Sequence, residues 1–135
     1  MAGHLIRRLH QQSTQVFQAR MQAAGHDLTS VQFAALDAIA QQPGIDQAGL
    51  AAAIGFDRAT IGGVLERLEA KGLVGRTVSP LDRRARVLGL TAAGQRLLAQ
   101  VRPVVESLQA EILAALGPAE QARFLALARR ALGLD

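Results

Sequence analysis

Apolar residues recur every three or four positions through the first 72 residues, which is the period of an amphipathic helix. The pattern predicts four helices, at about 4–24, 30–42, 47–54 and 58–71. The last three each follow a residue whose side chain caps helix N-termini, namely Thr29, Asp46 and Asp57. Glycine ends the first, third and fourth segments, and Pro43-Gly44 ends the second.

The period changes after Gly72. Residues 73–78 and 86–90 favour β-strands, and the turn-forming residues 79–82 lie between them. Thr91 then caps a long helical segment, 91–116, in which we expect Pro103 to introduce a bend. Gly117-Pro118 separates a last helix, 119–132. The chain is therefore expected to be mainly α with a small β-ribbon, in the order α-α-α-α-β-β-α-α, and to form a single domain over residues 1–135.

The third and fourth helices and the ribbon predict a winged helix-turn-helix within residues 29–90. Gly55 permits the tight turn between the two helices, and we expect Phe56 to plug their junction. Apolar residues of both helices can pack together, namely Leu50, Ala51 and Ile54 against Ile61, Leu65 and Leu68. If the fourth helix enters a DNA major groove, the residues available for contact are Arg58, Ala59, Thr60, Gly62, Gly63 and Arg67.

The charge distribution supports a nucleic-acid contact at the same place. The chain has 15 basic and 11 acidic residues, and 14 of the basic residues are arginine. Residues 1–56 and 97–135 are each neutral, so the whole +4 excess lies in 57–96. A localised basic stripe is typical of a DNA-binding surface, although a solvated face in an arginine-rich protein explains the charge alone equally well.

The loop of the ribbon concentrates this charge at Asp82, Arg83, Arg84 and the nearby Arg86. Guanidinium groups on a rigid loop suit the narrow, strongly negative minor groove of DNA. We expect Asp82 to orient one of the arginines through a bidentate ion pair. An ordinary solvated hairpin tip is the alternative, and the position directly after a helix-turn-helix favours DNA.

Three stretches of sequence resemble the multiple-antibiotic-resistance regulator (MarR) family across essentially the whole chain. They are residues 57–74, the run Ser79 to Ala85 with its Asp82-Arg83-Arg84, and Leu90-Thr91 followed by Gly94. The resemblance implies a homodimeric bacterial transcriptional regulator that binds palindromic operators, commonly a repressor released by small aromatic or phenolic acids.

Gly62-Gly63 departs from the resemblance, because the family often has a Ser/Thr-Arg pair there. Glycine offers no side-chain donor and costs roughly 1 kcal/mol of helix stability relative to alanine. Such residues allow the helix backbone to approach a base edge, or Gly63 makes room for tight helix packing. Arg58 and Thr60 are then the better candidates for base reading.

The flanking segments 1–24 and 91–135 are predicted to form the dimer. A helix over 91–116 is about 39 Å long and projects beyond a small winged domain. Its apolar stripe would be exposed in a monomer, so a second copy is the expected partner. The alternative is that the terminal helices fold back and bury these faces within one chain.

An effector site is predicted between the dimer helices and the winged part, near a polar cluster on the first helix. The candidate ligand contacts are His10, Ser13, Thr14, Phe17, Phe33 and Arg86. Arg7 or Arg8 offers an alternative cation to His10 for a carboxylate. A solvated His10 and a core position for Phe33 are the plainer interpretations.

The sequence lacks the residue patterns typical of metal sites, thiol chemistry and nucleotide binding. The chain has no cysteine, its three histidines are not at metal-ligand spacing, and no glycine-rich phosphate loop follows a strand. We therefore expect no enzyme, cofactor or metal. No apolar run approaches the roughly 18 residues of a membrane span, which predicts a cytoplasmic protein. The alternative function is a winged-helix module that docks a protein partner without sequence-specific DNA binding.

Overall fold

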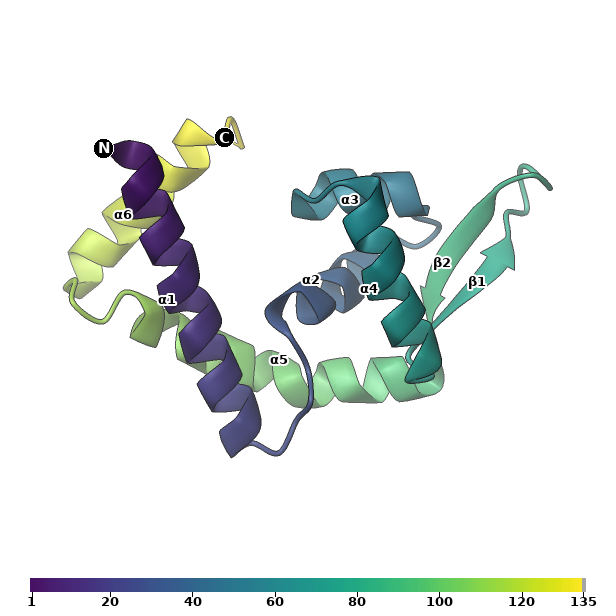
Figure 1. Ribbon diagram of the computed structural model, residues 1–135, viewed down its shortest axis with the longest axis horizontal. Coiled ribbons are helices and arrows are strands. Elements are labelled where there is room, and N and C mark those ends of the chain that lie inside the picture. The colour runs from purple at the N-terminus through teal and green to yellow at the C-terminus, as the bar shows by residue number, and fades with distance from the viewer. Residues whose placement is uncertain (135) are drawn as a thin grey trace.

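The computed structural model describes residues 1–134 and shows six helices and one two-stranded sheet (Figure 1). The elements are α1 (Ala2–Ala23), α2 (Ser30–Gln41), α3 (Gln47–Ile54), α4 (Arg58–Ala70), β1 (Val74–Val78), β2 (Arg86–Leu90), α5 (Ala92–Ile112) and α6 (Pro118–Ala131). The predicted fold class and element order are therefore confirmed. Asp135, the last residue of the segment 91–135, lies outside the described residues.

The predicted caps form in the structure. The side chains of Thr29, Asp46, Asp57 and Thr91 each accept a hydrogen bond from a backbone N–H in the first turn of the following helix. Thr29 and Gln32 complete a reciprocal capping box. Short polar side chains thus fix the start of four helices, which explains why these boundaries were predictable.

The C-terminal end of α5 differs from the prediction. α5 continues through Pro103 but ends at Ile112, not at residue 116, and is about 32 Å long. The Nε2 of Gln121 donates to the carbonyl oxygens of both Leu113 and Leu116 at 3.0 Å. The Gln121 side chain of α6 therefore provides a hydrogen-bond donor for the Leu113 and Leu116 carbonyls. If α5 continued to residue 116, these carbonyls would lie in its last turn and would have no donor within the helix.

The hydrophobic core lies mainly in the winged lobe, which is residues 29–90. Leu36, Leu50, Ile61, Leu65 and Leu68 are each 0% exposed, so α2, α3 and α4 close on one another as expected. Gly55 has φ +76°, the left-handed conformation required by the turn between α3 and α4. The expectation for Phe56 is wrong: its backbone N–H bonds the carbonyl of Ala51, but its side chain is 39% exposed.

The two strands pair antiparallel, with Val74 opposite Leu90 and Val78 opposite Arg86. The base of this wing is locked to the start of α5. The hydroxyl of Thr91 donates to the carbonyl oxygen of Gly72 at 2.6 Å. A Cβ at Gly94 would lie 2.1 Å from the carbonyl oxygen of Leu73, so only glycine allows this approach. The wing therefore rises from a fixed joint.

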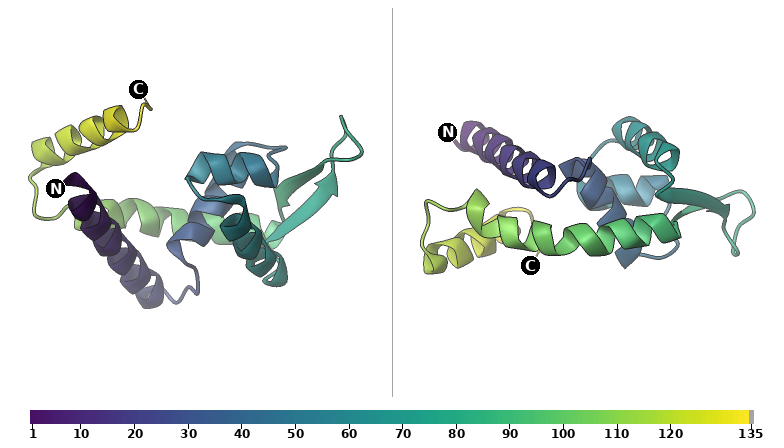
Figure 2. Two further views of the ribbon diagram at one scale, coloured as in Figure 1. Left: turned by 45° about the horizontal axis from the view of Figure 1, so that its top comes forward. Right: turned by 90° about the horizontal axis from the view of Figure 1, so that it is seen from below.

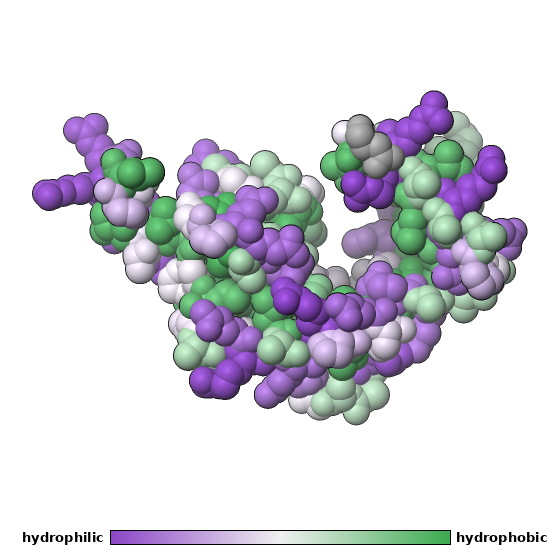
Figure 3. Space-filling model, turned by 180° about the vertical axis from the view of Figure 1, so that it is seen from behind, coloured by the Kyte–Doolittle hydropathy of each residue, from purple (hydrophilic) through white to green (hydrophobic). Residues whose placement is uncertain are grey.

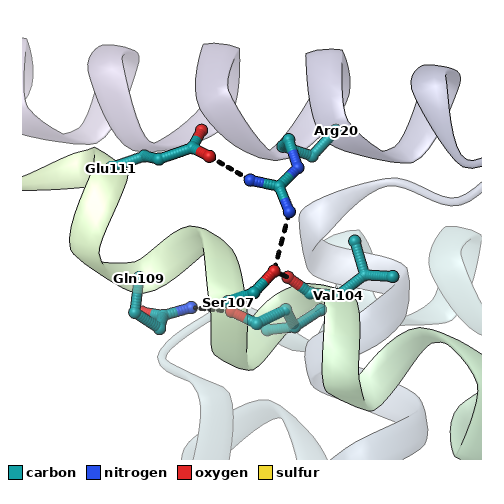
Figure 4. Close-up of polar contacts among 6 residues, drawn as sticks. Arg20, Val104, Ser107, Gln109 and Glu111 are labelled. Atoms are coloured by element: carbon teal, nitrogen blue, oxygen red, sulfur yellow. Dashed lines mark hydrogen bonds and ion pairs between the residues drawn. The ribbon is translucent and has the colours of Figure 1, made fainter.

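At the other end of the molecule, α1 packs across α5 through apolar and polar contacts. Phe17 and Met21 are buried. Figure 4 shows Arg20 of α1 reaching both Glu111 and Ser107 of α5, with its Nη2 donating to the Ser107 hydroxyl oxygen at 2.7 Å. The Nε2 of Gln12 donates to the carbonyl of Ile112 at 2.5 Å. We call α1, the C-terminal half of α5 and α6 the terminal lobe.

The terminal lobe leaves much apolar surface exposed. None of the fourteen residues of α6, all of them described, is buried. The two views of Figure 2 place α6 at the end of α5 opposite the wing. Figure 3 shows apolar side chains on the surface of this lobe, across a notch from the winged lobe. On this lobe and the residues next to it, the large apolar residues at least half exposed are Met1, Leu5, Ile6, Leu125, Leu127, Leu132 and Leu134. The alternative in which one chain buries these faces is therefore wrong.

No single helix within residues 1–134 has the length and apolar character of a membrane span. The α3–α4 pair meets the criterion by length and composition, but it bends by 108° at its turn. Its apolar side chains Leu50, Ile61 and Leu65 belong to the core.

Candidate nucleic-acid interface

The helix α4 presents three distinct faces, because successive residues turn by about 100° around its axis. One face is buried and consists of Ile61, Val64, Leu65 and Leu68. The face beside it turns toward α3 and the wing and contains Arg58, Gly62 and Glu69. The third face, opposite the core, is open and contains Ala59, Thr60, Gly63 and Arg67. Gly62 and Gly63 therefore lie on different faces of α4.

The N-terminal turn of α4 is ordered by Asp57. Its Oδ1 accepts a hydrogen bond from the Thr60 N–H at 2.8 Å, and its Oδ2 accepts one from the Thr60 hydroxyl at 2.9 Å. The backbone N–H of Thr60 is the largest cause, and the hydroxyl the next, of an Asp57 pKa below the usual 3.8. The carboxylate is thus ionised at neutral pH. Because the Thr60 hydroxyl donates its hydrogen bond to Asp57, only its oxygen lone pairs and the methyl group of the side chain are available to contact a ligand.

The predicted DNA-contacting residues of α4 are accessible. Arg58, Ala59, Thr60 and Arg67 are exposed, while Gly62 and Gly63 are half-buried. A Cβ at Gly63 would meet no atom within 4 Å, so tight helix packing does not explain this glycine. A Cβ at Gly62 would lie 3.2 Å from the Nε2 of Gln47. The two glycines thus have different surroundings.

The wing tip is shaped by Asp82, but not as expected. The Oδ1 of Asp82 accepts a hydrogen bond from the backbone N–H of Arg84 at 2.9 Å, and its carbonyl accepts one from Ala85 at 3.0 Å. Among residues 1–134, Asp82 makes no ion pair with an arginine. The predicted bidentate pair is therefore wrong, because a short side chain in a tight turn reaches the nearest backbone donor first. Asp82 fixes the loop and leaves the guanidinium groups unengaged.

Unpaired positive charge gathers on α4 and the wing. Two cations of segment 57–96 are engaged: Arg76 pairs with Glu69 at 2.7 Å, and Lys71 with Asp27 at 3.6 Å. The other six make no ion pair within the part of the chain that the structure describes: Arg58, Arg67, Arg83, Arg84, Arg86 and Arg96. Figure 1 shows the N-terminal end of α4 and the wing tip projecting to the same side, away from α5. All but Arg96 lie on these two elements.

Sequence reasoning missed a polar network between α4 and the wing. Gln47, at the start of α3, donates from Nε2 to the carbonyl oxygen of Arg58 at 3.1 Å. Its Oε1 accepts from the Nη1 of Arg76 on β1 at 3.1 Å, and the Nε of Arg76 donates to Glu69. We call Gln47, Glu69 and Arg76 the clasp. The pairing of these positions is set by tertiary packing, so no local sequence signal indicated it.

The predicted effector residues are not brought into one pocket. Ser13 lines a hollow of about 460 Å³ between α1, α5 and α6. Phe33 lines a neighbouring hollow of about 310 Å³ with Arg102, and the two hollows share Glu106 and Gln109.

The remaining effector candidates lie elsewhere. Phe17 is buried against Phe33, with ring centroids 6.1 Å apart. His10 is exposed, and the half-buried Thr14 donates from its hydroxyl to the His10 carbonyl. Arg86 begins β2, on the wing. None of these four lines either hollow.

Known proteins resemble this chain in sequence and in structure. A sequence profile described as MarR family matches residues 26–85. The transcriptional regulator HosA of Escherichia coli O111:H- is 41% identical over 129 residues, which cover 96% of this chain and 93% of HosA. The transcriptional repressor NicR of Pseudomonas putida is 36% identical over 133 residues, covering 98% of this chain and 83% of NicR.

The structural comparison agrees. BpsR of Bordetella bronchiseptica, whose DNA binding is regulated by 6-hydroxynicotinic acid, matches with a TM-score of 0.89 and 32% identity. The match covers 100% of this chain and 95% of BpsR. Two observations identify the family of this chain. One is the wing that follows the paired helices α3 and α4, and the other is the full-length similarity to these regulators. The chain belongs to the MarR family of winged helix-turn-helix, DNA-binding transcriptional regulators, which are not enzymes.

Proposed function

We propose that this protein is a homodimeric repressor that binds a palindromic operator and is released by a small aromatic or anionic effector. The observation that carries the proposal is the set of unpaired arginines on α4 and the wing, at one side of the molecule. A helix and a β-wing that project to the same side suit adjacent major and minor grooves. The name of NicR, a repressor, supports the direction of regulation.

The two elements have separate roles in this proposal. The open face of α4 enters the major groove, where Arg67 contacts base edges or phosphates and Thr60 accepts hydrogen bonds. Arg58, exposed in the first turn beside this face, contacts the flanking phosphates. Ala59 and Gly63 let the helix approach the bases closely. The wing places Arg84 in the minor groove, and Arg83 and Arg86 contact the flanking backbone. Asp82 contributes by holding the loop, as its bond to the Arg84 N–H indicates.

The homodimer is supported by the exposed apolar residues of the terminal lobe. Leu125, Leu127 and Leu132 on and just after α6 are 51–73% exposed, and Leu5 and Ile6 on α1 are 59% and 65% exposed. A second copy would cover these surfaces through an isologous contact and set two α4 helices against two half-sites. A palindromic operator follows from that symmetry.

The effector is supported by the hollow that Phe33 lines. It combines an aromatic ring with the guanidinium of Arg102, whose Nη2 lies 2.6 Å from the Oδ1 of Asp37. A carboxylate with a ring would compete with Asp37 for Arg102 there. BpsR, the structural neighbour, responds to 6-hydroxynicotinic acid, which has these features. Acting on DNA, the protein would work in the bacterial cytoplasm.

The decisive test is a salt titration of DNA binding with the variant Arg84→Ala. We expect weaker binding to the DNA flanking the protein's own gene, and a plot of log K against log salt whose slope falls by about 1 for each Arg84 removed. The matched control is Arg123→Ala, which removes the same charge from α6. Equal affinity and slope for Arg84→Ala and native protein would contradict the wing's role.

The same titration separates the alternative function. A protein-docking module would show no salt-sensitive binding to random duplex DNA at micromolar concentration. Sedimentation of the native protein gives its oligomeric state in parallel. Adding 6-hydroxynicotinic acid or benzoate to the operator complex tests release, and unchanged binding with both would contradict an aromatic-acid effector.

A further inference from the structure

The clasp joins three elements across the surface of α4. Gln47 connects α3 to the first turn of α4 through the Arg58 carbonyl at 3.1 Å. Arg76 connects β1 to both Gln47, at 3.1 Å, and Glu69, at 2.7 Å, near the other end of α4. Arg76 thus holds the C-terminal part of α4 directly, through Glu69, and its first turn indirectly, through Gln47.

Gly62 explains why Gln47 can reach the helix backbone. A helical side chain leans toward the N-terminus and covers the turn before it, so a residue at 62 shields the carbonyl at 58. Glycine leaves that carbonyl open from the side. A Cβ at 62 would lie 3.2 Å from the Gln47 Nε2, which would push the amide away from the carbonyl. Gly63, on the open face, has no such neighbour.

We propose that the clasp is a positioning device that fixes the wing relative to α4, and that Gly62 is the residue that admits it. The proposal rests on the proposed function, because it concerns how the two DNA-contacting elements are presented. With the clasp closed, α4 and the wing meet DNA as one preorganised unit, so less freedom is lost on binding. With the clasp open, the wing tip moves independently of α4.

The clasp acts on DNA binding more than on folding. The Arg76 and Glu69 side chains are 31% and 37% exposed, and ion pairs at such exposure add little to stability. The core beneath them is complete without them, since Ile61 and Leu65 are fully buried. A variant that opens the clasp should therefore fold normally.

The first test measures the wing directly and needs no DNA. Because the chain has no cysteine, Glu66→Cys on α4 and Leu81→Cys at the wing tip accept one spin label each without side reactions. The labelled chain is diluted into excess unlabelled chain, so that distances within one chain are measured by pulsed electron resonance. We expect Gln47→Ala to broaden the distance distribution, and the control Gln100→Ala, an exposed glutamine on α5, to leave it unchanged. Equal widths in all three proteins would overturn the proposal.

The second test asks whether Gln47 acts through the wing. Losing its hydrogen bonds should weaken operator binding about three- to tenfold. A double-mutant cycle combines Gln47→Ala with Arg84→Ala. The loss of operator affinity caused by Gln47→Ala should be smaller in the Arg84→Ala background, because a wing that lacks Arg84 contributes little to binding wherever it is positioned. Additive losses would instead show that Gln47 contacts DNA itself and would overturn the positioning role. Thermal midpoints of Gln47→Ala and Gln100→Ala should agree, and a selective drop for Gln47→Ala would show a structural role instead.

A conservative variant sharpens the result. Gln47→Glu keeps an acceptor for Arg76 but cannot donate to the Arg58 carbonyl. We expect it to restore only the part of the narrow distance distribution that depends on the contact with Arg76. No recovery would overturn the contribution of Arg76, and full recovery would overturn that of the Arg58 carbonyl and Gly62. If native protein shows no salt-sensitive DNA binding, the proposed function fails, while the label distances still decide whether the clasp holds the wing.

Discussion

The winged lobe and the terminal lobe bury their apolar residues in different ways. In the winged lobe, Leu36, Leu50, Ile61 and Leu65 are fully buried by residues of the same chain. In the terminal lobe, α6 has no buried residue although Leu125 and Leu127 lie on it. The winged lobe buries its apolar residues within one chain, whereas those on the outer surface of the terminal lobe are exposed, and in the proposed dimer a second copy would cover them. Stability of the two lobes should therefore depend differently on protein concentration.

The largest expected effect comes from truncating the core of the winged lobe. Leu65→Ala removes a fully buried side chain and should lower the free energy of unfolding by about 2–5 kcal/mol, measured by urea titration. The shift should be the same at every protein concentration. Its counterpart, Leu127→Ala on the half-exposed surface of α6, should change this free energy by less than about 0.5 kcal/mol and weaken self-association instead. An equal loss of folding stability in both variants would remove the distinction between the lobes.

A smaller effect is expected from the glycines of α4. Gly63→Ala should raise the free energy of unfolding by about 0.5–1 kcal/mol, because alanine favours helix and the added Cβ meets no atom. Gly62→Ala should gain less, since its Cβ lies 3.2 Å from the Gln47 amide. Urea titrations of both variants at two protein concentrations would measure the difference. An identical increase in the free energy of unfolding for both variants would mean that the Gln47 side chain moves aside from the new Cβ at no cost. An increase that depends on protein concentration would contradict a winged lobe that is stable within one chain.

The smallest effect concerns the charge that caps α4. The pKa of Asp57 in the folded protein lies below its ordinary value of 3.8, so its ionised form stabilises the fold above that pH. The stabilisation is lost as pH falls through the folded pKa. The variant Asp57→Asn keeps a capping oxygen without the charge. Its deficit in thermal midpoint should thus be present at pH 7 and vanish in strongly acidic solution. A deficit that persists unchanged at low pH would show that the charge is not its cause.

The fold was largely predictable because its signals are local. Capping residues such as Thr29, Asp46 and Asp57, and the glycines after helices, mark boundaries by chemistry within four residues. The end of α5 was predicted too late, because Gln121 of another helix terminates it. Phe56 was expected to plug the junction between the third and fourth helices, but it is 39% exposed beside the turn at Gly55.

The exposure of the candidate residues was predictable from the sequence, but their geometry was not. Arg58 and Arg84 are exposed, as expected for the first turn of a helix and for a hairpin loop. Helix geometry alone puts Gly62 and Gly63 on different faces, but the contact of Gln47 and Arg76 beside Gly62 depends on how α3 and β1 flank α4, which no local sequence signal encodes. Asp82 was expected to form an ion pair with an arginine side chain, but its carboxylate instead accepts a hydrogen bond from the backbone N–H of Arg84, two residues away.

The joint between the wing and α5 has a mechanical consequence. Gly94 brings the start of α5 against the backbone of Leu73, and Thr91 ties it to Gly72, so the wing base and this helix move as one piece. The other end of α5 is held to α1 by Arg20. The arm from these contacts at Ser107 and Glu111 to the start of α5 at Ala92 is about 22–28 Å, so a tilt of about 10° would displace the wing base by about 4–5 Å, more than the rise of one base pair. A rotation of the terminal lobe by this small angle would therefore be enough to shift the wing relative to a groove of bound DNA.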